Sequence, residues 1–234
     1  MGAAVNGLVL HGVSLGYRGR DVVTGVTGRF PPGSLVAVVG PNGAGKTTLL
    51  KGLLGLLPLR RGRIECAPPR ASLAYLAQAS EVDRGFPVTV EDFVAMGLWQ
   101  QVGGLRAVSP QGGERVRRAI ADVGLQGREG AWIGELSGGQ FQRVRFARLL
   151  VQDAPIVLLD EPFAGIDAPT QADLLRLVAG WHAQGRTVIA VLHDLALVRA
   201  HFPQTLALDG RVLAWGDTAQ ALAALTGATE AVAA

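Results

Sequence analysis

The stretch LVAVVGPNGAGKTT, residues Leu35–Thr48, decides the fold of this 234-residue chain. It opens with five apolar residues without polar alternation, a pattern typical of a strand buried on both faces of a parallel sheet. A glycine-rich loop follows, and the next residues have the apolar spacing of a helix. Residues Gly40–Thr47 fit the pattern G-x-x-x-x-G-K-[ST] in full, between a strand and a helix as this pattern requires. The stretch therefore predicts an α/β core that binds nucleotide phosphates.

The residue types in this loop suit phosphate chemistry. Glycines let main-chain N–H groups wrap around the phosphates, and Lys46 adds a positive charge at the β- and γ-phosphate oxygens. The hydroxyl of Thr47 suits a Mg²⁺ ion that bridges those oxygens. The predicted phosphate-binding residues are Gly40, Pro41, Asn42, Gly43, Ala44, Gly45, Lys46, Thr47 and Thr48.

Two further apolar runs end in polar residues of chemical interest. IVLL runs into Asp160 and Glu161, and TVIAVL runs into His193. Because ligands collect outside the carboxyl ends of strands in open α/β sheets, we expect these side chains at the same rim as the phosphate loop. Asp160 is expected to orient Mg²⁺, and Glu161 to act as base or positioner for a water in line with the γ-phosphate. His193 is expected to contact the γ-phosphate; a surface role for Glu161 and a structural role for His193 are the alternatives.

Two other residues are weaker candidates when taken singly. Gln78 follows the apolar run LAYLA, and its amide could reach Mg²⁺ and the attacking water, although many strands end in a glutamine. Tyr17 could stack on an adenine ring, as aromatic side chains do on bases. A core or surface tyrosine is an equal alternative at that position.

The stretch LSGGQ, Leu136–Gln140, has the character of a second anion site. A serine at the N-cap, followed by small residues, would leave the N–H groups at the start of a helix accessible to an anion. An ordinary capped helix start with a glycine-rich approach is the alternative.

The remaining sequence predicts how the chain is organised. Residues Leu8–Phe30 alternate apolar and small polar residues and predict an antiparallel β portion, and Arg211–Asp217 predicts one more strand. The helix that follows the phosphate loop is expected to continue to a stop at Pro58. From residue 219 onward the alanine-rich sequence predicts a weak helix and a frayed tail.

Between residues 90 and 131 the pattern changes to helical spacing, in VEDFVAMGLW and GERVRRAIADVGL, with a loop at about 103–113 between them. We interpret this region as an α-helical subdomain, at about 86–150, inserted in a single domain that covers residues 1–234. The predicted fold class is α/β, with a mainly parallel sheet, an N-terminal antiparallel β portion and this helical insertion.

Composition limits the classes of function. The formal charge is only +3, and the densest basic run, RRGR at residues 60–63, is interpreted as a solvated turn, so nucleic acid is not an expected partner. The single cysteine, Cys66, cannot form an internal disulfide and fits a reducing compartment. No apolar run approaches the roughly 20 residues that span a bilayer, and the N-terminal residues lack a signal-peptide pattern. We expect a soluble, cytoplasmic chain whose membrane role depends on partners.

In combination and order, these motifs resemble those of the ATP-binding subunit of ABC transporters, from about Leu8 to Gly216. The resemblance implies a P-loop NTPase core that hydrolyses ATP with Mg²⁺. Outside the phosphate loop it assigns nucleotide contacts to Tyr17, Ser137, Gly138, Gly139, Gln140 and Asp167. It assigns the reaction to Lys46, Gln78, Glu161 and His193, and the Mg²⁺ ion to Thr47, Gln78 and Asp160.

The resemblance also implies partners. Two such subunits face each other head to tail with two ATP molecules between them, so that LSGGQ of one caps the γ-phosphate held by the other. Integral membrane permease subunits convert this closing and opening into transport. The helical stretch around Phe86–Trp99 is where the family docks its membrane subunit, and the implied location is the inner face of the bacterial cell membrane.

A finer resemblance concerns the cargo. The stretches FPVTVEDFVAMG, EPFAGID and HDLALVRAHF are similar to the zinc and manganese importers of bacteria. That similarity implies an extracytoplasmic metal-binding protein as an indirect partner, because the cysteine and histidines here stand singly, without metal-ligand spacing. An ATPase subunit of a siderophore or haem importer is the first alternative. A non-transport ABC ATPase is the second, although the chain has neither a second cassette nor room for a long coiled coil.

Overall fold

The computed structural model describes residues 7–67, 69–79, 82–103 and 107–233. Within these ranges the chain forms two compact units. The first, here called the sheet unit, holds the residues up to Leu73, Pro155–Glu161 and the residues from Trp181 onward. The second, the helical unit, holds Ala74–Ala154 and Pro162–Gly180.

The sheet unit is built on the three apolar runs noted in the sequence. They form the parallel strands β3 (Leu35–Val39), β6 (Ile156–Asp160) and β7 (Thr187–Val191), and every residue of the three is buried. Strand β7 lies between the other two, pairing Val38 with Val191 on one side and Asp160 with Val191 on the other. The predicted parallel core is confirmed, and its three strands end at one rim.

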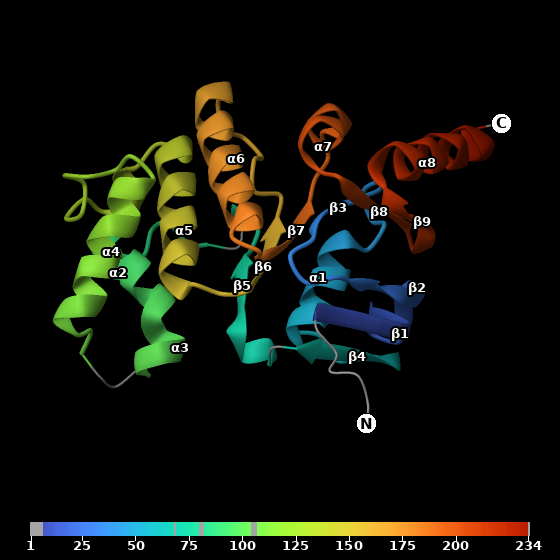
Figure 1. Cartoon of the computed structure of the whole chain (residues 1–234), viewed down its shortest axis with the longest axis horizontal. Coiled ribbons are helices and arrows are strands. Elements are labelled where there is room, and N and C mark those ends of the chain that lie inside the picture. The colour runs from blue at the N-terminus through green and yellow to red at the C-terminus, as the bar shows by residue number, and fades with distance from the viewer. Residues whose placement is uncertain (1–6, 68, 80–81, 104–106, 234) are drawn as a thin grey trace. The chain divides into compact units, whose positions relative to one another are not determined.

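Two more strands extend this sheet, in the order β6-β7-β3-β8-β9 (Figure 1). Strand β8 (Gln204–Asp209) runs parallel to β3, and β9 (Arg211–Asp217) returns antiparallel to β8 through Gly210, whose φ is 62°. The strand predicted at 211–217 is therefore confirmed with the same limits.

A separate antiparallel sheet has the order β2-β1-β4. Strands β1 (Gly7–Tyr17) and β2 (Arg20–Phe30) confirm the predicted antiparallel portion. Strand β4 (Arg61–Ala67) contains most of RRGR, so the turn interpretation of that run was wrong. The run is exposed, as expected, but its arginines are used in ion pairs: Arg60 Nε lies 2.5 Å from Asp21 Oδ1, and Arg63 pairs with Glu65.

Helices α1 (Lys46–Leu54), α7 (Leu195–His201) and α8 (Thr218–Ala233) complete the sheet unit, with the short turn η1 (Arg70–Ser72). Helix α1 ends before the predicted stop at Pro58, because Gly55 adopts a left-handed conformation (φ 78°) and its N–H bonds back to the last turn. Helix α8 continues to Ala233, so the expected frayed tail is instead helical over its described residues.

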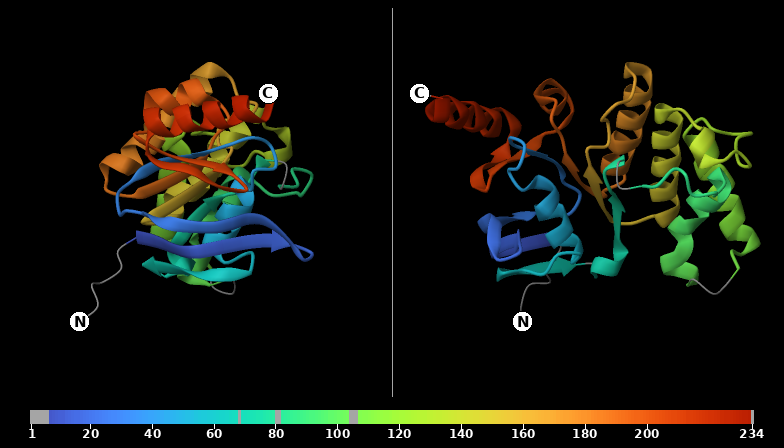
Figure 2. Two further views of the ribbon diagram at one scale, coloured as in Figure 1. Left: turned by 90° about the vertical axis from the view of Figure 1, so that its right-hand side faces the viewer. Right: turned by 180° about the vertical axis from the view of Figure 1, so that it is seen from behind.

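The helical unit contains strand β5 (Leu73–Leu76), apart from its first residue, and a bundle of helices, seen from behind in Figure 2. Its elements are α2 (Val90–Ala95), η3 (Met96–Leu98), α3 (Trp99–Val102), α4 (Pro110–Asp122), η4 (Ile133–Glu135), α5 (Gly138–Gln152) and α6 (Ala168–Ala183), the last of which ends in the sheet unit.

The predicted helical segments of this unit are present. Helix α4 begins earlier than expected, inside the predicted loop, because Ser109 caps it by accepting a hydrogen bond from the Gly112 N–H and Pro110 suits the first turn. Over the described stretches of the chain, none of the helices combines the length and apolar character that crossing a bilayer requires.

Candidate active site

The loop between β3 and α1 has room for glycine alone at two positions. A Cβ on Gly40 would lie 1.9 Å from the Leu208 carbonyl oxygen, and a Cβ on Gly45 would lie 2.2 Å from Val23 Cγ2. Gly45 is also the N-cap of α1, with a φ of 92°, and no side chain among the described residues caps that first turn. The helix-start N–H groups therefore remain available to an anionic ligand.

Lys46 holds this loop together from its centre. The residue is only 6% exposed, and its Nζ donates to the carbonyl oxygens of Gly40 and Pro41, each at 2.9 Å. Burial lowers the pKa of this amine below its ordinary value, while the nearby charges of Glu161 and Asp160 act in the opposite direction. Phosphate oxygens would compete for the same ammonium hydrogens.

A hydroxyl and a carboxylate meet beside the loop. Thr47 Oγ1 donates to Asp160 Oδ1 over 3.1 Å, and Asp160 is completely buried at the end of β6. A carboxylate buried in this way requires partners. These two hard oxygen donors fit the ligand preference of Mg²⁺.

Glu161 and His193 form a pair at the carboxyl ends of β6 and β7. Glu161 Oε1 lies 2.7 Å from His193 Nε2, and both side chains remain partly exposed. Glu161 has a φ of 49°, a left-handed conformation that costs an L-residue about 1–2 kcal/mol. Its N–H still bonds to the Val191 carbonyl oxygen at 3.2 Å. The backbone therefore turns sharply here and directs the carboxylate toward His193.

Tyr17 lies in the same sheet unit, at the end of β1. It pairs with Arg20 across a two-residue turn whose central residues, Arg18 and Gly19, have φ values of 47° and 85°. Tyr17 is 46% exposed as a residue. Of the alternatives that the sequence left open, a core tyrosine is therefore wrong.

The stretch LSGGQ lies in the helical unit, at the start of α5. Ser137 Oγ accepts from the Gln140 N–H at 3.2 Å, and Gln140 Oε1 accepts from the Ser137 N–H at 3.0 Å. This is a capping box, so one helix-start N–H already has a partner within the chain. The N-cap serine predicted from the sequence is therefore present, and it uses the Gln140 N–H.

Asp167 begins α6 within the helical unit. Its carboxylate accepts from the Thr170 N–H at 2.8 Å and from the Thr170 hydroxyl at 3.0 Å. These hydrogen bonds hold the pKa of the Asp167 carboxyl below its ordinary value. A Cβ on Gly139 would lie 3.3 Å from Asp167 Oδ2, so the small residue lets the two segments approach closely.

Gln78 follows β5 in the helical unit and is half-buried. Two residues near it were missed by the sequence analysis: Arg145, which donates to the Ala77 carbonyl oxygen, and Gln142, which accepts from Arg145. The sequence held a signal for them, because both interrupt the apolar positions of α5 three residues apart.

The predicted site residues thus form two groups. The sheet unit brings together the phosphate loop, Asp160, Glu161 and His193, and also carries Tyr17. The helical unit carries Gln78, Ser137–Gln140 and Asp167.

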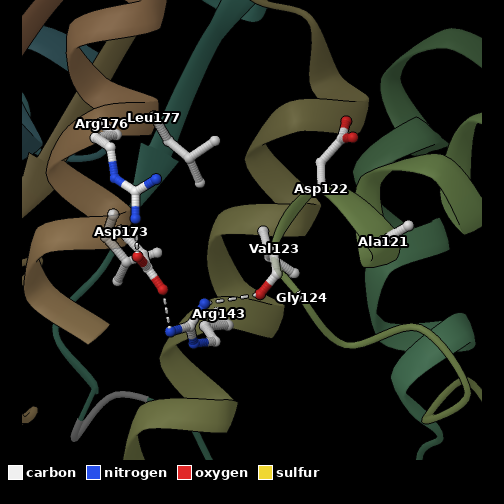
Figure 3. Close-up of a pocket in the computed structure, with 9 residues that line it drawn as sticks. Ala121, Asp122, Val123, Gly124, Arg143, Asp173, Arg176 and Leu177 are labelled. Carbon is white, nitrogen blue, oxygen red and sulfur yellow. Dashed lines mark hydrogen bonds and ion pairs between the residues drawn. The ribbon is translucent and has the colours of Figure 1, made fainter. Parts of the chain in front are cut away.

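A cavity of about 350 Å³ lies among α4, α5 and α6 of the helical unit (Figure 3). Arg143 spans it, donating to the Val123 carbonyl oxygen at 3.0 Å and pairing with Asp173, which also pairs with Arg176. Both arginines thus share the one carboxylate of Asp173, and the contacts of Arg143 join the three helices.

Comparisons with known proteins agree on one family. Residues 23–164, more than half of the chain, match the family described as "ABC transporter". The zinc transport system ATP-binding protein of Treponema pallidum is 42% identical, over 89% of this chain and 80% of its own length. The manganese transport system ATP-binding protein of Listeria monocytogenes is 39% identical, over 90% of each chain.

A solved ATP-binding subunit of an ABC transporter superposes with a TM-score of 0.77 at 26% identity, covering 91% of this chain and 90% of its own. The fold, the phosphate loop and these matches establish the assignment. The chain belongs to the ABC transporter family, as an ATP-binding subunit with ATPase activity.

Proposed function

We propose that this chain hydrolyses ATP to power the import of zinc or manganese through a partner membrane permease. The observation that carries the ATPase part is the rim where the phosphate loop, the Thr47–Asp160 pair and the Glu161–His193 pair meet. The cargo part rests on the relatives named for zinc and manganese transport, which match nearly the full chain.

The sheet unit would bind the nucleotide. Main-chain N–H groups of residues 40–48 and the Lys46 ammonium would surround the phosphates, and the exposed Tyr17 ring would stack on the adenine. Thr47 and Asp160 would hold a Mg²⁺ ion, with Gln78 as a further oxygen donor. When bound, the ion would offset the charge that develops on the phosphate oxygens.

Glu161 would serve as the base or positioner of the attacking water. Its carboxylate is fixed by the hydrogen bond to His193, which holds it at the end of β6 beside the buried Asp160. His193 would in turn be directed at the γ-phosphate by the same contact. The left-handed backbone of Glu161 would turn its side chain away from that of Asp160, so the two adjacent acids would take different roles.

The helical unit would act on a second copy of the chain. Ser137–Gln140 at the start of α5 would cap the γ-phosphate bound by a partner subunit, and Asp167 would lie at the same interface. Gln140 is occupied by the capping box, so we assign the phosphate contact to Ser137, Gly138 and Gly139 in preference to the Gln140 N–H.

Other partners follow from the proposed role. Exposed aromatic residues of the helical unit, Phe86, Trp99 and Trp132, are candidates for docking the permease at the inner face of the membrane. Metal selection would reside in that permease and in an extracytoplasmic metal-binding protein, and nucleic acid is not a proposed partner.

The test is a deletion strain complemented with the wild-type gene or with Glu161→Gln. We expect cellular zinc or manganese, measured by mass spectrometry under limitation for each metal, to fall in the deletion strain. The wild-type gene should restore it, and the Glu161→Gln variant should not. Unchanged zinc and manganese together with lost use of a siderophore or haem would contradict the proposal and favour the iron-chelate alternative.

A further inference from the structure

Arg145 is a buried cation on the helix that begins at the LSGGQ stretch. It lies within α5 and is only 3% exposed as a residue, and arginine is rarely buried to this extent unless it is paired. One guanidinium nitrogen donates to Gln142 Oε1 at 2.6 Å, and the other terminal nitrogen donates to the Ala77 carbonyl oxygen. Its ring neighbour is Phe141, whose centroid lies 6.0 Å from the guanidinium carbon.

Gln142 extends this chain of hydrogen bonds to Pro162. The residue is 4% exposed, and its side-chain amide nitrogen donates to the Pro162 carbonyl oxygen. Because arginine has donors and no acceptor, the amide oxygen of Gln142 must face Arg145 and the NH₂ group must face Pro162. The result is a relay of three hydrogen bonds with fixed donor and acceptor roles: Arg145 donates to the Ala77 carbonyl oxygen and to Gln142, and Gln142 donates to the Pro162 carbonyl oxygen.

Both ends of the relay lie one residue from a proposed site residue. The Ala77 carbonyl belongs to the peptide group that joins Ala77 to Gln78, and Pro162 directly follows Glu161. The middle of the relay is on α5, eight residues or fewer after Ser137. Three segments that are far apart in the sequence are thereby joined through two buried side chains of one helix.

We propose that Arg145 is a positioning residue, which couples the placement of the LSGGQ helix to that of Gln78 and of the loop after Glu161. This inference rests on the ATPase function proposed above. Apolar side chains would fill this interior at least as favourably as a buried charge, so packing alone does not explain an arginine here. A guanidinium, in contrast, can hold two acceptors at fixed angles, and a misplacement of about 1 Å at a reacting centre can cost a hundredfold in rate.

The test compares three full-length variants in ATP hydrolysis, ATP binding and thermal unfolding. Arg145→Met fills the same volume without donors, and we expect kcat to fall at least about tenfold with little change in the affinity for ATP. Arg145→Lys keeps the charge but loses the planar pair of donors, so it should recover only part of kcat. Arg143→Met is the matched control on the same helix, because Arg143 bonds to Val123 and Asp173 among α4 and α6 (Figure 3).

Arg143→Met should lower the unfolding temperature without the selective loss of kcat. A kcat for folded Arg145→Met equal to that of Arg143→Met would overturn the inference. Gln142→Met allows a second comparison. If Arg145 and Gln142 act through the same relay, the kcat of the double variant Gln142→Met/Arg145→Met should be no lower than that of the slower single variant. If the kcat losses of the two single variants instead multiply in the double variant, the two side chains act independently, and the inference is also overturned.

If the methionine variants do not fold, a comparison of the wild-type protein with Arg145→Lys tests the inference. The kcat of Arg145→Lys should lie below that of wild type at a similar affinity for ATP, because lysine cannot hold two acceptors at fixed angles. A wild-type kcat in Arg145→Lys would count against the relay. The proposed ATPase function fails separately, by absence of hydrolysis in wild type, whereas this inference fails when wild type hydrolyses ATP and the Arg145 variants match it.

Discussion

At the scale of single residues, the site depends on buried charged groups and on the hydrogen-bond partners that compensate their burial. Asp160 is completely buried beside the Thr47 hydroxyl, and Lys46 is buried among loop carbonyl oxygens. Both residues are costly to the folded state unless a ligand or a neighbour compensates them. The sequence predicted these residues because their spacing is tied to phosphate chemistry. The sequence marks Arg145 and Gln142 as polar residues among the apolar positions of α5, but it could not predict which distant carbonyl groups these side chains meet.

The first prediction concerns Glu161. Replacing it by Gln removes the basic oxygen but keeps an amide oxygen that can still accept from His193. We expect kcat for ATP hydrolysis to fall by about a hundredfold or more while ATP remains bound. Steady-state hydrolysis and nucleotide binding check this, with Glu129→Gln, in a loop of the helical unit, as the control. Normal turnover by Glu161→Gln would remove Glu161 from the proposed role.

At the scale of elements, strands were easier to predict than helix limits. The buried strands β3, β6 and β7 consist of uninterrupted apolar residues, which leave few alternatives. Helix α1 ended early because Gly55 could cap it, a choice that the apolar pattern continuing to Leu57 did not reveal. Strand β4 was missed because its exposed arginines have a solvated character, and only pairing with β1 makes that segment a strand.

The second prediction uses two glycines of the phosphate loop that differ in their surroundings. Gly43 and Gly45 both have left-handed φ values, 82° and 92°, but a Cβ on Gly43 would meet no atom within 4 Å. Gly43→Ala should therefore cost only the backbone strain, about 1–2 kcal/mol of unfolding free energy. Gly45→Ala must also displace Val23, which adds about 1–3 kcal/mol. Urea unfolding of the two variants checks this difference, and equal stabilities would contradict the close packing of Gly45.

The third prediction concerns the start of α6 and acidic pH. The pKa of Asp167 is lowered chiefly by its hydrogen bond from the Thr170 N–H, so the folded state favours the ionised carboxylate. That stabilisation is present above the unfolded pKa, about 3.9, and is lost as the pH falls through the lower folded pKa. The unfolding temperature of wild type should exceed that of Asp167→Asn at pH 7.

This excess should shrink as the pH is lowered below about 4, where the wild-type carboxylate becomes protonated. Thermal unfolding at a series of pH values measures it, and Asp122→Asn on α4 controls for the change in net charge. If the difference in unfolding temperature instead grows as the pH falls, the pKa of Asp167 is not lowered in the folded state.

At the scale of the whole molecule, the residues of the proposed site are divided between two units. The phosphate loop, Asp160, Glu161 and His193 belong to the sheet unit, whereas Ser137–Gln140 and Asp167 belong to the helical unit. We propose that LSGGQ serves the ATP bound by a partner subunit. Two chains in head-to-tail arrangement would then make two equivalent sites, each with one phosphate loop and one LSGGQ stretch.

The most direct measurement counts the ATP trapped by mixed dimers in a Glu161→Gln background, with Lys46→Ala in one subunit and Ser137→Arg in the other. If LSGGQ acts across the interface, both defects fall in one site, and each dimer should retain one ATP. With both changes in the same chain and a partner carrying neither, each site has one defect and no ATP should be trapped. The reverse result, no ATP in the first dimer and one in the second, would show that LSGGQ serves its own chain and would contradict the account.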